Sequence, residues 1–162
     1  MQFNAVHPNN LRSAPEKNGA NKENNFDLSV LLIDDQSETT KFLGKLLHGN
    51  NIRTFYANDG RQALDLLGKP NAVMPDLIIC DIYMPNMCGM EFCNSMRLAQ
   101  NRDLRRIPII VLTGDYNTEL DEVLQQINVL KVVRKPISLK DLTKVIYDTI
   151  GFKKYTYKNN LY

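Results

Sequence analysis

Residues 77–89 of this chain read Leu77-Ile78-Ile79-Cys80-Asp81-Ile82-Tyr83-Met84-Pro85-Asn86-Met87-Cys88-Gly89. The apolar run ends on a carboxylate, Asp81, and a loop containing proline and glycine follows. A short apolar run before such a loop predicts a buried strand of a parallel sheet. The side chain of Asp81 would then lie at the carboxyl edge of the sheet, where open α/β folds bind ligands.

Further strands and helices alternate along the chain. The apolar segments predict five strands, at 28–33, 52–57, 77–80, 107–112 and 129–133. A helical pattern follows each strand, and strict alternation with short loops requires a parallel sheet with helices on both faces. The expected fold is therefore α/β: a flavodoxin-like, doubly wound (βα)5 sandwich whose five-stranded sheet has the order 2-1-3-4-5.

The helix boundaries follow from capping residues and apolar spacing. The first helix is expected to begin after an N-cap at Asp35 or Ser37 and to bury one apolar face, formed by Phe42, Leu43, Leu46 and Leu47. The last helix is expected to begin at a capping pair, Ser138 and Asp141, and to stop at Gly151.

Composition limits the possible functions. The 162 residues are enough for one domain with its own core. A net charge of +2 is too small to argue for direct nucleic-acid binding, and no apolar run approaches the roughly 20 residues of a membrane span. The three cysteines contain no CxxC pair, so neither a disulfide framework nor a zinc site is expected. A reducing cytoplasm is the simplest compartment.

The two ends of the chain differ from its centre. Residues 1–26 are polar and rich in asparagine, which predicts a disordered N-terminal extension that is either a solvated tail or a partner arm. Residues 151–162 form a C-terminal tail in which aromatic and basic residues alternate. This tail is either a frayed helix end or a segment that docks on a partner, a membrane surface or nucleic acid.

Polar side chains follow four of the five predicted strands. Asp34 and Asp35 follow the first strand, Asp81 the third, Thr113 the fourth and Lys135 the fifth. In the order 2-1-3-4-5 the first and third strands are neighbours, so the three carboxylates are expected to converge. Grouped carboxylates suit a hard divalent cation such as Mg²⁺, and a nearby lysine suits a transferred phosphate or Asp81 itself. This combination indicates phosphoryl transfer onto Asp81.

The same residues carry a resemblance to a known family. Asp34-Asp35, Asp81 with the following Met84-Pro85 and Gly89, Thr113-Gly114, and Lys135-Pro136 together resemble the receiver domain of two-component response regulators. The resemblance covers residues 27–150. It implies a single-domain signalling module that takes a phosphoryl group from a histidine kinase or a histidine phosphotransfer protein and then acts on a downstream protein target.

The resemblance also implies roles for particular residues. Asp81 would be the phosphoacceptor, and Asp35, Asp81 and the main-chain carbonyl of Tyr83 would bind Mg²⁺, with Asp34 acting directly or through water. The module would catalyse its own phosphorylation and dephosphorylation, and it would not be an enzyme acting on a separate substrate.

Switching is implied at the other strand ends. Thr113 would hydrogen-bond the phosphoryl group, Lys135 would pair with it, and the bond to Pro136 would be cis, a state that X-Pro bonds reach at low cost. Phosphorylation would remodel the face formed by the helix around 120–127, the strand 129–133 and the last helix.

Two features depart from the family pattern or vary within it. The aromatic residue expected three positions before Lys135 is Val132 here, so the coupling of Thr113 to that face would differ. Tyr83 and Asp115 occupy the two positions that tune the phosphate lifetime, and either could screen or orient the attacking water.

Alternative interpretations remain at this stage. Asp34-Asp35 could be only a turn and N-cap. A phosphatase of the haloacid-dehalogenase type also uses an aspartate nucleophile with Mg²⁺, but its Asp-x-Asp pattern lies on the first strand and is absent here. A receiver that acts as a scaffold independently of phosphorylation is the main alternative function.

Overall fold

The computed structural model describes residues 26 and 28–159, with side chains described as far as Gly151. Five parallel strands form one sheet of order β2-β1-β3-β4-β5. The strands are β1 (Leu28–Ile33), β2 (Ile52–Ala57), β3 (Leu77–Cys80), β4 (Ile109–Thr113) and β5 (Lys131–Arg134). The predicted fold class and strand order are confirmed.

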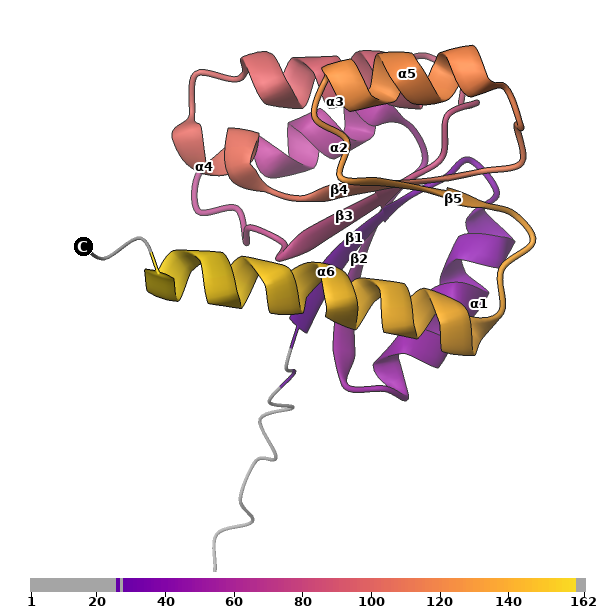
Figure 1. Ribbon diagram of the computed structural model, residues 1–162, viewed down its shortest axis with the longest axis vertical. Helices are drawn as coiled ribbons and strands as arrows, with labels where there is room; N and C mark the ends of the chain where they lie inside the picture. The colour runs from indigo at the N-terminus through magenta and orange to yellow at the C-terminus, as the bar shows by residue number, and fades with distance from the viewer. Residues whose placement is uncertain (1–25, 27, 160–162) are drawn as a thin grey trace, which may run out of the picture.

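Helices cover both faces of the sheet (Figure 1). α1 (Ser37–His48) and α6 (Leu139–Asn159) lie on one face. The opposite face carries α2 (Gly60–Leu67), α3 (Gly89–Leu98), α4 (Arg102–Arg106) and α5 (Thr118–Gln126). Because every strand runs in the same direction, all carboxyl ends meet at one edge of the sheet and all amino ends at the other.

The alternation of side chains along the strands produces two cores. In β3, Ile78 and Cys80 join the cluster under α2, α3 and α5, whereas Leu77 and Ile79 join the cluster under α1 and α6. All four residues of β3 are buried, as expected for the central strand of a sheet covered on both faces. The strand that carries Asp81 to the sheet edge is therefore held from both sides.

The first helix differs from its prediction. Its N-cap is Gln36, not Asp35 or Ser37, and Gln36 makes no side-chain capping bond. The Asp34 carboxylate accepts the Gln36 N–H at 2.9 Å. Phe42 is 65% exposed, so its assignment to the buried face was wrong. Leu47 is the buried leucine of α1. A Cβ at Gly44 would clash with the Tyr56 ring, so the close approach of α1 to β2 depends on that glycine.

Other boundaries also moved. An additional short helix, α4, lies between α3 and β4 where a loop was expected, and β4 begins at Ile109, after Pro108. The capping pair of Ser138 and Asp141 is confirmed, with the Asp141 N–H donating to Ser138 Oγ at 3.1 Å. The predicted stop at Gly151 was wrong, since α6 continues to Asn159. One glycine costs a helix only about 1 kcal/mol, and no proline follows it to end the helix.

The termini fall largely outside this description. The predicted N-terminal extension over 1–26 lies outside the described residues except for Phe26, whose ring packs edge-on against His48. Residues 160–162 of the predicted C-terminal tail also lie outside them. No helix among the described residues is long and apolar enough to span a membrane.

Candidate functional site

Asp34 and Asp81 converge at the carboxyl edge of the sheet. Ile33 at the end of β1 is paired with Cys80 at the end of β3. Asp34 and Asp81, the next residue in each chain segment, therefore lie side by side. The Asp81 N–H donates to the Ile33 carbonyl at 2.8 Å, which continues the strand pairing beyond β3. The sheet register therefore sets the approach of these two carboxylates.

Lys135 joins the two carboxylates. Its Nζ donates to Asp34 Oδ2 and to Asp81 Oδ2, each at 2.7 Å. Burial alone would lower the pKa of Lys135, but its hydrogen bonds to Asp34 and Asp81 outweigh this effect and raise the pKa above its ordinary value. The lysine backbone is fixed as well, because its N–H donates to the Thr113 carbonyl at 2.8 Å. The Lys135–Pro136 bond is cis, the geometry that the family resemblance implied.

The remaining carboxylate oxygens have backbone partners. Asp81 Oδ1 accepts the Ile82 N–H at 2.6 Å, and Asp34 Oδ1 accepts the Gln36 N–H. Asp34 thus combines a turn-forming role with a place in the charged cluster. The Asp35 side chain is exposed and makes no hydrogen bond or ion pair within the described part of the chain. A cavity of about 50 Å³ lies beside Asp34, Asp81 and Lys135.

The backbone of Asp81 is closely supported. The Cys80 thiol donates to the Asp81 carbonyl at 3.0 Å, and burial raises the pKa of that thiol well above its usual range, so it keeps its proton. Gly89, the first residue of α3, lies against the same carbonyl, and a Cβ there would come within 2.0 Å of the oxygen. The loop from Asp81 to α3 folds this tightly because position 89 has no side chain.

A neighbouring helix anchors the loop that follows Asp81. Asp59, the N-cap of α2, accepts the Gln62 N–H at 2.8 Å and the Asn86 side-chain amide at 2.7 Å. These two hydrogen bonds hold the pKa of Asp59 below its usual value. Asn86 has a φ of 60°, a left-handed conformation that asparagine tolerates better than most residues. The loop is therefore fixed at its midpoint as well as at Gly89.

Thr113 lies at the end of β4 and is completely buried. Its Oγ1 accepts the Asp115 N–H at 3.1 Å. The hydroxyl thus contacts the backbone of the following loop, and it is not among the groups that contact the Asp81 carboxylate. The sequence placed Thr113 at the correct edge, and the structure adds that its hydroxyl holds the loop leading to α5.

Tyr83 and Asp115 form a contact that the sequence did not reveal. The Tyr83 hydroxyl donates to Asp115 Oδ2. This bond raises the pKa of Tyr83 and lowers that of Asp115, because it favours a neutral phenol beside a charged carboxylate. The sequence predicts a role in the phosphate lifetime for both positions but no contact between them. Their pairing connects the loop after β3 to the loop after β4, 32 residues apart.

A second unpredicted network involves Tyr116. Its hydroxyl donates to the Lys135 carbonyl at 3.2 Å, and its ring lies 5.6 Å from the Arg134 guanidinium. Arg134 Nη2 in turn contacts both oxygens of Asp121 in α5, at 2.7 and 2.6 Å. Val132 is half-buried in β5. Tyr116, from the β4–α5 loop, is an aromatic residue that contacts Arg134 and Lys135 on this side of the site.

The donor set can be tested against Mg²⁺. Asp34, Asp35 and Asp81 offer only carboxylate oxygens, which is the ligand chemistry that Mg²⁺ prefers. No group of three His, Cys, Asp or Glu residues among the described residues is gathered tightly enough to form a metal cluster by itself. The structure brings Asp34 and Asp81 together but not the exposed Asp35, and two carboxylates still fit Mg²⁺, which needs only one or two direct carboxylates and keeps several waters.

Comparisons with known proteins agree with this arrangement. The sequence model of the response regulator receiver domain matches residues 30–147. The chain is 32% identical over 125 residues to hybrid signal transduction histidine kinase D of Dictyostelium discoideum, a match that covers 77% of this chain and 8% of the kinase. It is 28% identical to the polar-differentiation response regulator DivK of Brucella ovis, over 76% of this chain and 96% of DivK.

Solved structures have the same fold. The chemotaxis response regulator CheY4 of Vibrio cholerae superposes with a TM-score of 0.66 at 26% identity, over 75% of this chain and 97% of CheY4. A CheY-like receiver domain protein of Methanospirillum hungatei gives a TM-score of 0.71 at 17% identity, over 80% of this chain and 98% of that protein, which is a likeness of fold alone. The matched region is thus a small part of the kinase and nearly all of DivK and CheY4.

Proposed function

This chain belongs to the response regulator receiver family, and from that premise we propose that Asp81 accepts a phosphoryl group from a phosphohistidine. The donor is a histidine kinase or a histidine phosphotransfer protein in a two-component phosphorelay. The observation that carries the proposal is the Lys135 ammonium, which contacts Asp34 and Asp81 at 2.7 Å each. A cation held this closely against a strand-end carboxylate is already placed to neutralise an incoming phosphoryl group.

The transfer requires few groups. An oxygen of Asp81 attacks the phosphorus, the bond between phosphorus and the donor imidazole breaks, and its electron pair stays on the imidazole nitrogen. Lys135 moves its hydrogen bonds from the carboxylates toward the phosphoryl oxygens, where negative charge is concentrated. Its raised pKa keeps it protonated throughout neutral pH. The chain therefore contributes mainly position and charge, as in other phosphoryl transfers.

We assign the Mg²⁺ ligands to Asp34, Asp35, Asp81 and the main-chain carbonyl of Tyr83. A bound Mg²⁺ supplies positive charge to the transferred phosphoryl oxygens. Asp35 is exposed and has no other partner among the described residues, which leaves its carboxylate available for this role. Gly89 and Cys80 fix the backbone on which Asp81 stands, and they limit how far the ligand set has to reorganise.

The switch begins at Thr113. Its hydroxyl gives up the Asp115 N–H and turns to the phosphoryl group, which releases the β4–α5 loop. Tyr116 and Arg134 then carry this change to Asp121 and so to the face formed by α5, β5 and α6, where a downstream protein target binds. The contacts from Tyr116 to Lys135 and from Arg134 to Asp121 support this route. It does not need the aromatic residue that Val132 replaces.

The lifetime of the phosphate is set by Tyr83 and Asp115. Their hydrogen bond spans the two loops beside the acceptor. We propose that the pair restricts the water that hydrolyses the aspartyl phosphate. This step completes the module's own dephosphorylation and returns it to its resting state. The cytoplasm, where histidine kinases present their phosphohistidine, is the expected compartment.

Intact-mass spectrometry tests the acceptor. The wild-type chain, Asp81→Asn and Asp76→Asn are incubated with a small-molecule phosphodonor, with and without Mg²⁺. Asp76 lies at the opposite end of the same strand, hydrogen-bonded to Ser29, and is the matched control. We expect one Mg²⁺-dependent phosphate adduct in the wild type and in Asp76→Asn, and none in Asp81→Asn. An adduct that persists in Asp81→Asn would contradict the assignment, and no adduct in any variant would favour the scaffold function.

A further inference from the structure

A half-buried arginine marks the edge of the sheet opposite Asp81. Arg97 in α3 donates from Nη1 to the Arg105 and Ile107 carbonyls, at 2.8 and 3.0 Å, and from Nη2 to the Asn128 carbonyl at 2.9 Å. Its Nε is buried and has no hydrogen-bond partner. Within the described residues, all hydrogen-bond partners of this guanidinium are neutral carbonyls, and no carboxylate pairs with its positive charge. Burying an uncompensated charge is unfavourable and is relieved by a nearby anion.

A large cavity adjoins this arginine. It has a volume of about 700 Å³, and its apolar wall is formed by Ile107, Pro108 and Leu130. Ile107 and Pro108 directly precede β4, and Leu130 directly precedes β5. Pro108 and Thr113 lie five residues apart along β4, about 16–17 Å at roughly 3.3 Å per residue. The cavity is therefore distinct from the site around Asp81. Its volume lies within the range of small-molecule pockets.

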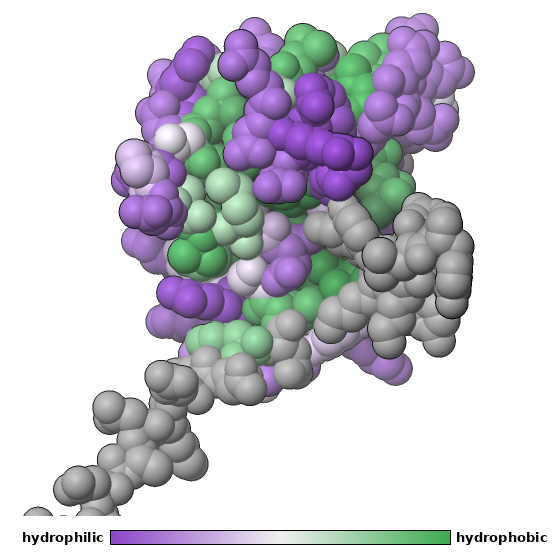
Figure 2. Space-filling model, turned by 90° about the vertical axis from the view of Figure 1, so that its left-hand side faces the viewer, coloured by the Kyte–Doolittle hydropathy of each residue, from purple (hydrophilic) through white to green (hydrophobic). Residues whose placement is uncertain are grey.

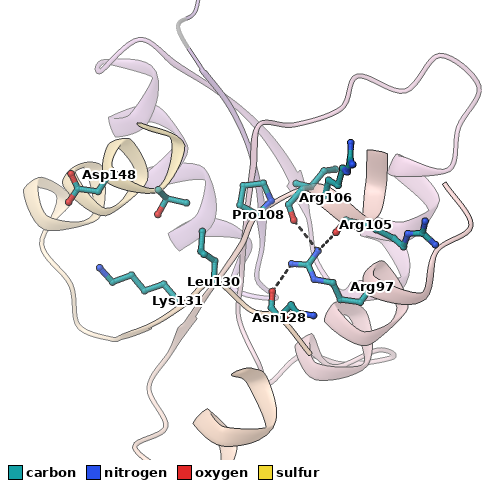
Figure 3. A pocket seen from close by; sticks show the side chains of 10 residues that line it. Arg97, Arg105, Arg106, Pro108, Asn128, Leu130, Lys131 and Asp148 are labelled. Carbon is teal, nitrogen blue, oxygen red and sulfur yellow. Dashed lines mark hydrogen bonds between the residues drawn. The ribbon is translucent and has the colours of Figure 1, made fainter. Parts of the chain in front are cut away.

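Cations surround the apolar wall. Arg105 and Arg106 lie on one side of the cavity and Lys131 on the other, with Pro108 and Leu130 between them (Figure 3). These three cationic side chains are exposed and have no ion pair or hydrogen bond within the described residues. Figure 2 shows this end of the molecule, where strongly hydrophilic residues lie beside hydrophobic ones.

The acidic residue of the cavity does not balance these charges. Asp148 in α6 is paired with Lys144 of the same helix at 2.6 Å. Its charge is therefore already matched by a cation outside the cavity lining. Arg97, Arg105, Arg106 and Lys131 leave a net positive charge around an apolar wall.

We propose that this cavity binds a small organic phosphate: an apolar body lies against Ile107, Pro108 and Leu130, and the exposed side chains of Lys131 and of Arg105 and Arg106, which point away from one another in Figure 3, turn toward its phosphate head when it binds. Arginine forks and a lysine ammonium suit a doubly charged phosphate better than a single carboxylate, because several cations can each contact a different oxygen. The concave, partly apolar lining favours a small ligand over a nucleic-acid backbone, which needs an extended basic surface.

The charge of residues 151–162 makes them unsuited to fill this cavity themselves. Residues 151–162 contain three lysines and no aspartate or glutamate. A segment of this charge is repelled by Arg105, Arg106 and Lys131. The ligand is therefore expected to come from solution.

Titration of the full ¹⁵N-labelled chain tests the site by NMR. The probes are 1-naphthyl phosphate, 1-naphthoate, 1-naphthol and inorganic phosphate, added without divalent metal so that Asp81 is not phosphorylated. We expect 1-naphthyl phosphate to cause saturating shifts in the amides of residues 105–107, 109 and 128–131. The other three probes, each lacking the phosphate or the apolar body, should bind at least about tenfold more weakly.

Variants make the result specific. Arg106→Gln combined with Lys131→Gln should weaken 1-naphthyl phosphate about tenfold or more and leave 1-naphthol unchanged. Arg102→Gln removes an exposed arginine from the same short helix outside the cavity, and it should have less than about a twofold effect. The proposal is overturned if Arg102→Gln weakens binding equally, if 1-naphthoate binds as tightly, or if the shifts map to the Asp81 edge.

Discussion

The two edges of this sheet carry opposite chemistry. At the carboxyl edge, Asp34 and Asp81 share the ammonium of Lys135 beside a cavity of only about 50 Å³. At the amino edge, Arg105 and Lys131 line a cavity of about 700 Å³ and have no ion pair in the part of the chain that the structure describes. The first edge has an excess of carboxylates and suits a divalent cation and phosphoryl transfer. The second has an excess of cations and suits an anion.

On the proposed assignment of Asp81 as phosphoacceptor, the reaction takes place beside the smaller of these two cavities. The larger cavity contains no nucleophile beside a positioned cation, whereas the small one lies next to both. The pairing of Lys135 with Asp81 at 2.7 Å places a cation beside the proposed phosphoacceptor. The exposed cations at the amino edge have no ion pair within the described residues, and there we propose an anion site.

Of the changes considered, removal of the Lys135 charge should have the largest effect, and it acts on the phosphorylation rate at the carboxyl edge. Lys135→Gln leaves the Asp34 and Asp81 carboxylates facing each other without a cation. It also removes the positive charge that would stabilise the phosphoryl oxygens, so we expect the rate of phosphorylation to fall by about 100-fold or more. Because the pKa of Lys135 is raised, its charge and its contribution to stability persist at neutral pH and are lost only as pH rises through that raised value. The rate of adduct formation in stopped reactions is the measurement.

The matched control is Lys144→Gln. Lys144 also pairs with an aspartate, Asp148 at 2.6 Å, but the two side chains are 72% and 53% exposed. Exposed pairs of this kind contribute about 0–1 kcal/mol to stability. The phosphorylation rate should therefore be unchanged, and an equal loss in both variants would show that Lys135 acts only through general charge.

The rigidity of the acidic edge is tested at Gly89. Gly89→Ala places a Cβ against the Asp81 carbonyl, so we expect the free energy of unfolding to fall by about 1–3 kcal/mol. Gly114→Ala is the control at the same edge, since a Cβ there meets nothing within 4 Å. Denaturant titration of both variants gives the comparison. Equal stability of the two would mean that the Asp81 loop adjusts freely.

A smaller effect is expected at Tyr83. Asp115→Asn removes the carboxylate that accepts its hydroxyl, so the raised pKa of Tyr83 should fall toward the ordinary value of about 10. Titration of labelled tyrosine by ¹³C NMR measures the change. Asp121→Asn is the control, because Asp121 pairs with Arg134 instead. If the pKa of Tyr83 stays raised in Asp115→Asn, the hydrogen bond to Asp115 is not its cause, and the proposed contact between the two loops is contradicted.

Much of the acidic edge could be predicted from the sequence. Buried strands with continuous apolar runs are easy to recognise, and parallel strands must bring their following residues to one edge. Asp34, Asp81 and Lys135 were placed together by this reasoning alone, and the strand order was correct. The same argument applied to the beginnings of the strands would have drawn attention to Arg105, Arg106 and Lys131.

Other features depended on tertiary structure. Helix α4 has five residues and no buried side chain, so it leaves no apolar periodicity in the sequence. Phe42 looked like a core residue because its neighbours in α1 are apolar, yet the helix faces the sheet through Leu47. The contact between Tyr83 and Asp115 joins two loops whose conformations the sequence pattern does not determine.

The most direct test of the contrast is to locate the phosphoryl group after phosphorylation of the wild-type chain. Borohydride reduction converts an aspartyl phosphate to homoserine, which tandem mass spectrometry places within a peptide. We predict conversion at Asp81 and none at Asp34, Asp35 or Asp76. Conversion at another aspartate, with Asp81 unmodified, would contradict the central claim that the sheet and Lys135 prepare Asp81 as the phosphoacceptor.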